Sequence, residues 1–194
     1  AHMGGDIGYS HSWQLGLSHW SADVEDRGSE DAGEGPSFSG DSDINALDFV
    51  YKWAPNGDAT QRNFKFQFEY FDREEDGGLT VEGGEPLQLT SFDGDQQGWY
   101  AQAIYQFVPQ WRAGVRYDRL QSDNGAANAS LLQAAGLNEE GFKPKRFSTM
   151  LEWVPSEFSR IRLQYNYDKS YAETDNQWLL QYTFSLGAHG AHAF

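Results

Sequence analysis

Charged side chains occupy every second position in several segments of this sequence, and they are the groups best placed to do chemistry. Side chains two residues apart lie on the same face of a β-strand, so each segment would collect its charges on one face. The bases in this pattern are Lys52, Lys65, Arg112, Arg116, Arg146, Arg160 and Arg162, and the acids are Asp48, Glu69, Asp118, Glu152 and Asp168. Such a face would either attract anions along a water-filled passage or pair its charges into a network that fills a narrow interior.

Two further groups of side chains could bind cations. His189 and His192 would form a set of three imidazoles with His11, which would suit zinc or copper, although a tail with incidental histidines is the favoured interpretation. Oxygen-rich clusters that could hold a divalent cation are Glu30-Asp31, Asp41-Ser42-Asp43 and Glu74-Glu75-Asp76. None of these clusters has the spacing of a calcium-binding loop, and solvated acidic loops are the favoured alternative.

No pattern of a catalytic site is present. The chain has no cysteine, no phosphate-binding or dinucleotide-binding glycine motif, and no Ser-His-Asp arrangement that the spacing supports. The sequence therefore predicts a protein that is not an enzyme and that carries no cofactor, apart from the divalent cation considered above.

Composition indicates one domain with unevenly distributed charge. The 194 residues are 15% aromatic, which argues against disorder even though the mean hydropathy is -0.70. The net charge of -15 resides in residues 21–43, 72–95 and 121–145, and this distribution disfavours nucleic acid as a partner. Residues 1–5, which include Ala1-His2-Met3, resemble a cloning remnant or linker, so we expect residues 6–194 to form the domain.

Eight segments alternate between large apolar and polar residues, as strands with one apolar face do. They lie near residues 11–20, 44–53, 63–71, 99–107, 111–118, 146–153, 160–168 and 177–186. Their connections alternate in length, since short turns near 55–58, 108–110 and 155–157 are separated by long acidic segments, except for a short last connection at 170–175. Short turns at one end and long loops at the other predict an all-β, antiparallel barrel of about eight strands.

The tryptophans are expected to form two belts, as indole rings do at the two surfaces of a membrane. Those assigned to the belts are Trp13, Trp53, Trp111 and Trp153 at the short-turn end, and Trp20, Trp99 and Trp178 at the long-loop end. The alternative is a soluble β-sandwich or lipocalin-like barrel, in which the apolar face would point inward.

With these features the chain, over residues 8–194, resembles Gram-negative outer-membrane β-barrel proteins. The most specific element is the terminal amphipathic strand with Tyr182 and Phe184 and the final aromatic Phe194. The resemblance implies an integral outer-membrane protein with short periplasmic turns, long acidic extracellular loops and a periplasmic tail at 187–194. It also implies insertion by the barrel-assembly machinery and contact with outer-membrane lipid and lipopolysaccharide, to which Lys143, Lys145 and Arg146 would contribute.

The arginine-bearing face is also similar to that of the phosphate-selective porin class. Those barrels are larger, so this resemblance leaves two alternatives open, a complete small barrel or the C-terminal part of a larger one. The expected function is porin-like passive passage of small solutes, with anions preferred. The alternatives are a closed structural barrel whose acidic loops bind cations, lipopolysaccharide or a partner, and capture of a transition metal by the histidine tail. A short helix is expected within 126–136, more favoured on the surface than folded into the mouth, and the sequence leaves oligomerisation open.

Overall fold

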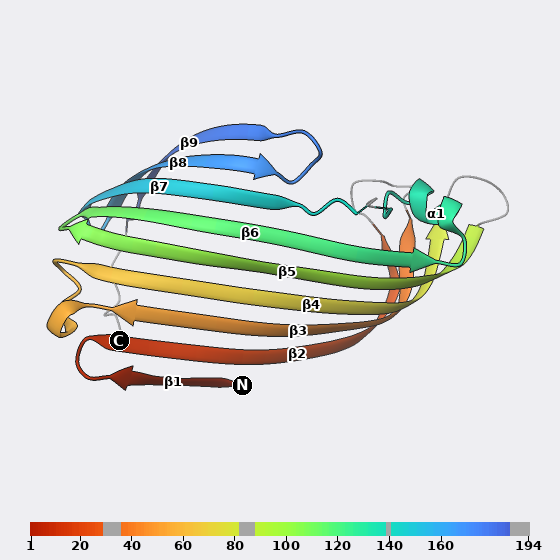
Figure 1. Ribbon diagram of the computed structural model, residues 1–194, viewed down its shortest axis with the longest axis horizontal. Helices are drawn as coiled ribbons and strands as arrows, with labels where there is room; N and C mark the ends of the chain where they lie inside the picture. Colours follow the sequence, from red (N-terminus) through yellow and green to blue (C-terminus); the bar gives the residue numbers. More distant parts are fainter. Residues whose placement is uncertain (29–35, 82–87, 139–140, 187–194) are drawn as a thin grey trace.

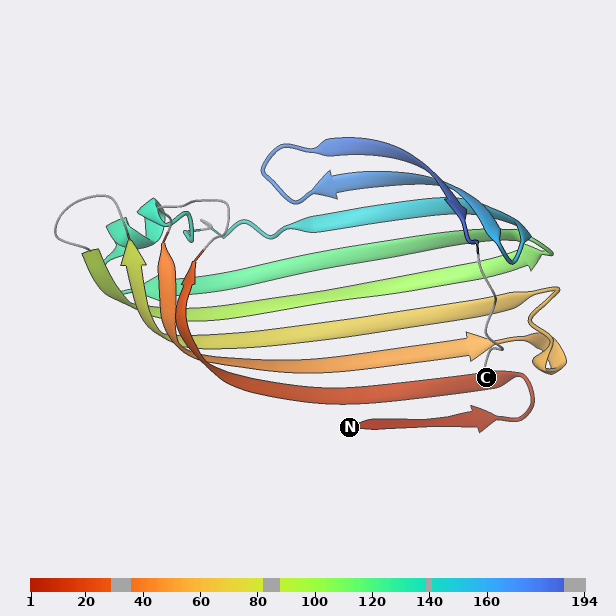
Figure 2. The same ribbon diagram turned by 180° about the vertical axis from the view of Figure 1, so that it is seen from behind.

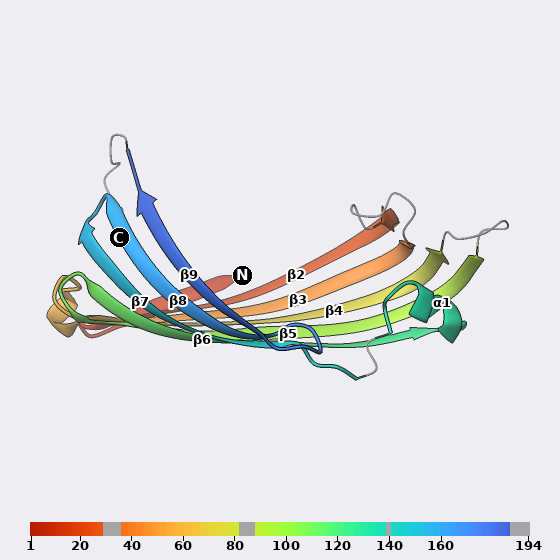
Figure 3. The ribbon, with the colours of Figure 1, turned by 90° about the horizontal axis from the view of Figure 1, so that it is seen from above.

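The protein is one antiparallel sheet of nine strands, curved into a trough (Figures 1–3). The computed structural model describes residues 1–28, 36–81, 88–138 and 141–186. The strands follow one another in chain order and are β1 (His2–Ile7), β2 (His11–Gly28), β3 (Ser37–Trp53), β4 (Asn63–Val81), β5 (Gln88–Val108), β6 (Trp111–Ala126), β7 (Lys145–Ser156), β8 (Ser159–Lys169) and β9 (Asp175–Phe184). A short 3-10 turn, η1 (Pro55–Gly57), and one helix, α1 (Ala129–Ala134), complete the elements of the described residues.

The cross-strand register separates the two kinds of side chain. Phe49 of β3 pairs with Phe68 of β4, and the next residue, Asp48, pairs with Glu69. The same matching continues to β8 and β9, where Leu163 pairs with Leu180. Because successive side chains point to opposite faces, this register places the apolar rows on one face and the charged rows on the other. We call these the outer face and the inner face, because α1 packs on the charged side and lies inside the curve of the trough (Figure 3).

All eight predicted strands are present as β2 to β9, but two features of the predicted barrel differ. The described residues form nine strands, because residues 2–7, which include part of the expected linker, pair with β2 as β1. The sheet is also open, since β1 and β9 are its two edges and are not joined in the strand order. The sequence pattern does not report closure, because alternation is the same in an open sheet and in a barrel wall.

The acidic segments, predicted to be loops, largely continue the strands. Asp41, Asp76 and Asp93 lie side by side in β3, β4 and β5, and β5 alone has 21 residues. Glycines make part of this extension possible. A Cβ atom at Gly40 would lie 2.3 Å from the carbonyl oxygen of Asp76, and one at Gly77 would lie 2.3 Å from that of Ser39. Only glycine permits backbones to approach so closely.

The buried apolar cluster of the described residues lies at the long-loop end of the inner face. It consists of Phe38, Leu79, Phe92 and Leu132. The helix expected within 126–136 is α1, capped by the Asn128 side chain, and it is followed by Gly136 at φ +70°. Its Leu131 and Leu132 are buried, so α1 folds onto the sheet instead of forming a surface turn. No helix of the described residues has the length and apolar character to cross a membrane.

Shortening the buried face of α1 should destabilise the long-loop end. We expect Leu132→Ala to lower the free energy of unfolding by about 2–5 kcal/mol, because it opens a cavity beside Phe38 and Phe92. Leu89→Ala is the control, since Leu89 is 73% exposed, and it should change the stability little. Denaturant unfolding followed by tryptophan fluorescence measures both variants, and equal losses would contradict the packing of α1.

Candidate functional site on the inner face

All of the charged residues that the sequence assigned to the passage lie on the inner face. The register joins them in cross-strand steps such as Lys52–Lys65, Arg112–Glu152 and Asp118–Arg146. This face is also the more buried one. Its buried polar side chains are Ser42, Glu75, Thr90, Gln106, Ser148, Glu152, Asn166 and Asp168. Burial is therefore inverted relative to a soluble protein, since the carboxylates of Glu75, Glu152 and Asp168 are buried while large apolar side chains are exposed.

Glu152 is the centre of an arginine cluster near the short turns. Its carboxylate, with a side chain 3% exposed, accepts hydrogen bonds from Nε and Nη2 of Arg162 at 2.9 and 2.7 Å. Arg112 and Arg160 each lie 3.6 Å from the same carboxylate. Charge-assisted hydrogen bonds hold Glu152 in place, and three guanidinium groups around one carboxylate leave a net charge of +2.

Lys52 and Lys65 extend this positive charge across the sheet. They are directly opposite each other in β3 and β4, one row of inner-face side chains away from the Arg112–Glu152 pair. Neither has a carboxylate within salt-bridge distance among the described residues. We call these two lysines, together with Arg112, Arg160, Arg162 and their shared Glu152, the basic band. Like charges placed opposite each other destabilise a sheet, so the pair favours an arrangement in which an anion can approach.

The opposite sign prevails further along the strands. A row of inner-face side chains crosses the sheet through Asp48, Glu69, Tyr100, Asp118, Arg146, Asp168 and Asp175. Within it Arg146 is paired with Asp168, and Arg116 reaches from the neighbouring row to Asp118 at 2.7 Å. The guanidinium of Arg116 also lies 3.7 Å from the centre of the Tyr100 ring, which supports it from the other side. Two of the predicted arginines are therefore held by local acids.

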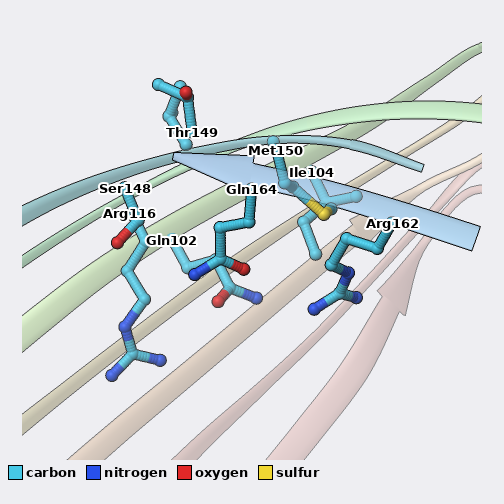
Figure 4. A pocket seen from close by; sticks show the side chains of 10 residues that line it. Gln102, Ile104, Arg116, Ser148, Thr149, Met150, Arg162 and Gln164 are labelled. Carbon is cyan, nitrogen blue, oxygen red and sulfur yellow. The ribbon is translucent and has the colours of Figure 1, made fainter. Parts of the chain in front are cut away.

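Amide side chains separate these two regions and line a small cavity. Gln102, Arg116, Ser148, Gln164 and Arg162 border a cavity of about 80 Å³. Figure 4 shows Gln102, Arg116, Gln164 and Arg162 extending to one side of the strands and Thr149 to the other. A larger hollow of about 730 Å³ lies toward the long-loop end, and its lining combines inner-face residues such as Phe71, Tyr100 and Arg146 with outer-face residues such as Trp99, Arg119 and Lys145. The inner face therefore carries a small cavity bordered by polar side chains, and the larger hollow has a mixed apolar and cationic lining.

The outer face carries six of the seven predicted belt tryptophans. Trp111 and Trp153 stack with their ring centres 6.2 Å apart, and Trp99 lies 5.4 Å from Tyr117. Trp13, Trp53 and Trp178 share the same face by register. Trp20 was wrongly assigned, because it pairs with Ile44 in the row beside Ser42 and so lies on the inner face. Its position in the sequence suggested a belt, but its parity along β2 is opposite to that of Trp13.

Sequence reasoning missed a buried ion cluster at the long-loop end of the inner face. Both carboxylate oxygens of Glu75 accept hydrogen bonds from Arg27, at 2.7 and 3.0 Å, and Ser42 donates a third at 3.0 Å. Arg73 lies 3.2 Å away. Burial would raise the pKa of Glu75, but the hydrogen bonds from Arg27 and Ser42 and the charges of both arginines outweigh burial and hold this pKa below its usual range. The sequence did not indicate this ion pair, because Arg27 and Glu75 are 48 residues apart in the chain.

The outer face also has a feature that the sequence analysis did not predict, an acidic array beyond the apolar rows at the long-loop end. Two adjacent rows contain Asp23, Asp41, Asp76 and Asp93, and Asp43, Glu74, Asp95 and Asp123. The pleat therefore splits the clusters expected from the sequence, since Glu75 and Ser42 point inward while their neighbours point outward. Repulsion from Asp23, with further contributions from a hydrogen bond to Asp23 and from Asp43 and Asp76, raises the pKa of Asp41.

The expected metal and insertion residues are only partly described. His11 Nδ1 lies 2.6 Å from the hydroxyl of Tyr51, whereas His189, His192 and Phe194 lie outside the described residues, as does Glu30-Asp31. Within the described part of the chain, no group of three or more histidine or acidic side chains is arranged to hold a metal ion. Tyr182 and Phe184 of β9 are exposed, with ring centres 6.4 Å apart.

Comparison with known proteins gives one informative similarity. The chain is 32% identical over 174 residues to an uncharacterised protein of Aquifex aeolicus (strain VF5). The match covers 85% of this chain but 34% of the relative, so the chain spans about a third of the length of the curated relative it matches. No family model and no solved structure matches the chain.

Removing the charge of Glu75 should destabilise the protein at neutral pH. We expect Glu75→Gln to cost about 1–3 kcal/mol, because it leaves Arg27 and Arg73 without a counter-charge. The expected loss of stability is smaller than for a fully buried ion pair, since the Arg27 side chain is 41% exposed.

The pH dependence of that loss follows from the lowered pKa of Glu75. The contribution is fully present above the ordinary carboxyl pKa and is lost as the pH falls through the folded-state pKa. Denaturant unfolding at successively lower pH should therefore show the wild type and Glu75→Gln converging in acid. A difference that does not change with pH would contradict this ion cluster.

In the acidic array, removing one carboxylate should stabilise the folded protein at neutral pH instead of destabilising it. Because the pKa of Asp41 is raised, its ionised form destabilises the folded state, and this penalty disappears as the pH falls through the raised pKa. Asp41→Asn should therefore raise the unfolding midpoint at pH 7 and at low salt, and leave it unchanged in acid or at high salt.

Asp58→Asn is the control of opposite sign for this measurement. The Thr60 hydroxyl and backbone N–H donate to Asp58 and lower its pKa. Its replacement should lower the midpoint at pH 7. If Asp41→Asn also lowers the midpoint, the acids are not crowded on the outer face.

Proposed function

We propose that this chain is part of the wall of an outer-membrane β-barrel through which small solutes pass, with anions preferred. The single observation that carries the proposal is the inverted burial of the two faces. Leu180, Trp178 and Leu17 of the outer face are 77%, 70% and 57% exposed, whereas Glu152 and Asp168 of the inner face are 2% and 5% exposed. An exposed apolar surface of this extent is stable where lipid covers it.

The length of the apolar stretch along the strands supports a position in a lipid bilayer. On β6 the apolar outer positions begin at Trp111 and end before Arg119. These positions span the seven residues from Trp111 to Tyr117, and with one residue at headgroup level on either side they reach the lower end of the roughly 9–11 residues that a tilted strand needs to cross a bilayer. The remaining part of β6 and the upper parts of β3 to β5 would then extend beyond the lipid, which agrees with their acidic outer positions.

The open sheet supports a wall that is completed by further strands. An isolated edge presents unpaired N–H and C=O groups, which hydrocarbon cannot satisfy, so a spanning sheet must close. The Aquifex relative is about three times as long as the region that it shares with this chain, and therefore has residues beyond the matched region that could supply more strands. A larger barrel would also leave the inner face lining a channel, because interiors widen as strands are added.

The basic band supports a preference for anions. Lys52, Lys65 and the three arginines around Glu152 carry five positive charges against one negative charge in neighbouring rows of the inner face. Fixed charges at the wall of a passage raise the local concentration of ions of opposite sign.

A closed structural barrel is the second candidate. Each inner-face arginine of the described residues has a carboxylate within 4.0 Å, and Arg27, Arg146 and Arg162 are examples. Such pairing would suit a filled interior. Lys52 and Lys65, which have no carboxylate within 4.0 Å among the described residues, favour an open one.

Association with lipid is tested first. We expect the purified full chain to aggregate or remain unfolded in detergent-free buffer, and to gain β-structure, measured by circular dichroism, when neutral detergent or phospholipid vesicles are added. A folded monomer in plain buffer would remove the membrane assignment, because the outer face would then be stable in water.

Selectivity is tested by changing Lys52 and Lys65, the two inner-face lysines that have no carboxylate partner in the described part of the chain. In planar bilayers the wild type should give a reversal potential that favours anions. Lys52→Glu/Lys65→Glu should shift the reversal potential toward cations, and it removes no ion pair that the described residues form. Lys143→Glu/Lys169→Glu is the matched control, since it makes the same change in charge at an exposed residue before β7 and at an outer-face residue of β8. Absence of ion current would favour the closed barrel, and equal shifts in both variants would show that the lysines do not line the path.

A further inference from the structure

Three cations form a row on the outer face of the sheet. Arg119 of β6 pairs in register with Lys145 of β7, which pairs with Lys169 of β8. They belong to the outer face because the adjacent residues Asp118, Arg146 and Asp168 form the inner-face row. We call these three residues the outer basic row. Adjacent strands are about 4.8 Å apart, so the row is about 10 Å wide.

The outer basic row differs from the inner-face arginines in having no acidic partner within the ranges that the structure describes. Arg112, Arg116 and Arg146 each have a carboxylate within 4.0 Å. Among the described residues, none lies at that distance from Arg119, Lys145 or Lys169. Three like charges on neighbouring strands repel one another, so the folded protein gains stability when an anion binds between them.

The position of the row indicates which anion would meet it. One step toward the short turns, the register joins Tyr117, Phe147 and Tyr167 on the same face. Trp99 pairs directly with Arg119, and the ammonium of Lys169 lies 5.7 Å from the centre of the Tyr167 ring. Tyrosine and tryptophan mark the level of lipid headgroups, where an apolar face ends. The cations therefore lie where the apolar rows give way to polar ones, at their long-loop side.

We propose that Arg119, Lys145 and Lys169 bind the phosphate groups of lipopolysaccharide in the leaflet that surrounds the long-loop end. This inference rests on the proposed function, because it requires lipid on the outer face. Charge complementarity supports it, since guanidinium groups bind phosphate oxygens in a bidentate manner and lysine binds them as a point charge. The acyl chains of the same lipid would cover Phe147 and Tyr167 below the row.

The test measures the binding of lipid A, the phosphorylated anchor of lipopolysaccharide, to the full chain folded in neutral detergent. Native mass spectrometry counts the lipid that stays bound at increasing concentrations. We expect Arg119→Gln/Lys145→Gln/Lys169→Gln to weaken binding by about tenfold or more. Lipid A without its phosphate groups should bind the wild type as weakly as phosphorylated lipid A binds the triple variant.

A pair of single variants separates the row from net charge. Lys145→Gln changes the central member of the row, whereas Arg62→Gln removes the same charge from the turn after β3. Only the first should weaken binding. Equal binding by the wild type and the triple variant, or equal loss in both single variants, would overturn the proposal.

Free phosphate is tested as a competing source of the same chemistry. Inorganic phosphate at millimolar concentration should displace little lipid A, because the lipid also gains apolar contacts with the outer face. Full displacement would show a site for soluble anions and would overturn the assignment to lipid. Circular dichroism in vesicles is measured on the same variants, so loss of lipid A binding with normal folding in vesicles separates this proposal from the membrane proposal.

Discussion

Residue pairs such as Phe49–Phe68 and Asp48–Glu69 follow one another along β3 and β4 without a slip, and backbone hydrogen bonds hold that register. A shift of one residue would move every aromatic side chain of a strand to the charged face. The aromatic and ionic pairs therefore both depend on the ladder. Because the ladder runs from β2 to β9, one continuous apolar surface and one continuous charged surface result, and each has a different solvent requirement.

The charged surface is organised by local pairing as well as by alternation. Glu152 binds three arginines, whereas Lys52 and Lys65 lie opposite each other with no carboxylate within 4.0 Å among the residues that the structure describes. Positive charge thus accumulates near the short turns, and acids accumulate in the row of Asp48 and Glu69 about 13 Å further along the strands from Lys52 and Lys65. The outer face is likewise divided beyond its aromatic rows, with the acidic array over β2 to β6 and the outer basic row over β6 to β8.

Several sequence predictions succeeded because they rest on properties of single strands. Alternation located all eight expected strands, and parity alone placed residues as distant as Lys52 and Arg162 on the same face. Trp20 shows where the prediction was wrong. It lies near the expected end of its strand and was therefore assigned to a belt, but its position in the alternation places it on the inner face. The prediction that the acidic segments form loops was wrong for a related reason. High charge suggested loops, but acids alternate in strands as readily as other polar residues when one face is solvated.

The sequence by itself determined the eight alternating strands and placed the candidate passage residues together on one face, because a period of two is a local property of extended backbone. Only the tertiary structure decided which residues meet across strands. It joined Arg27 to Glu75, brought eight outer acids together, folded α1 onto Phe38 and Phe92, and left the sheet open between β1 and β9. Those outcomes depend on contacts between residues far apart in the chain, and the alternation of a single strand carries no information about its partners.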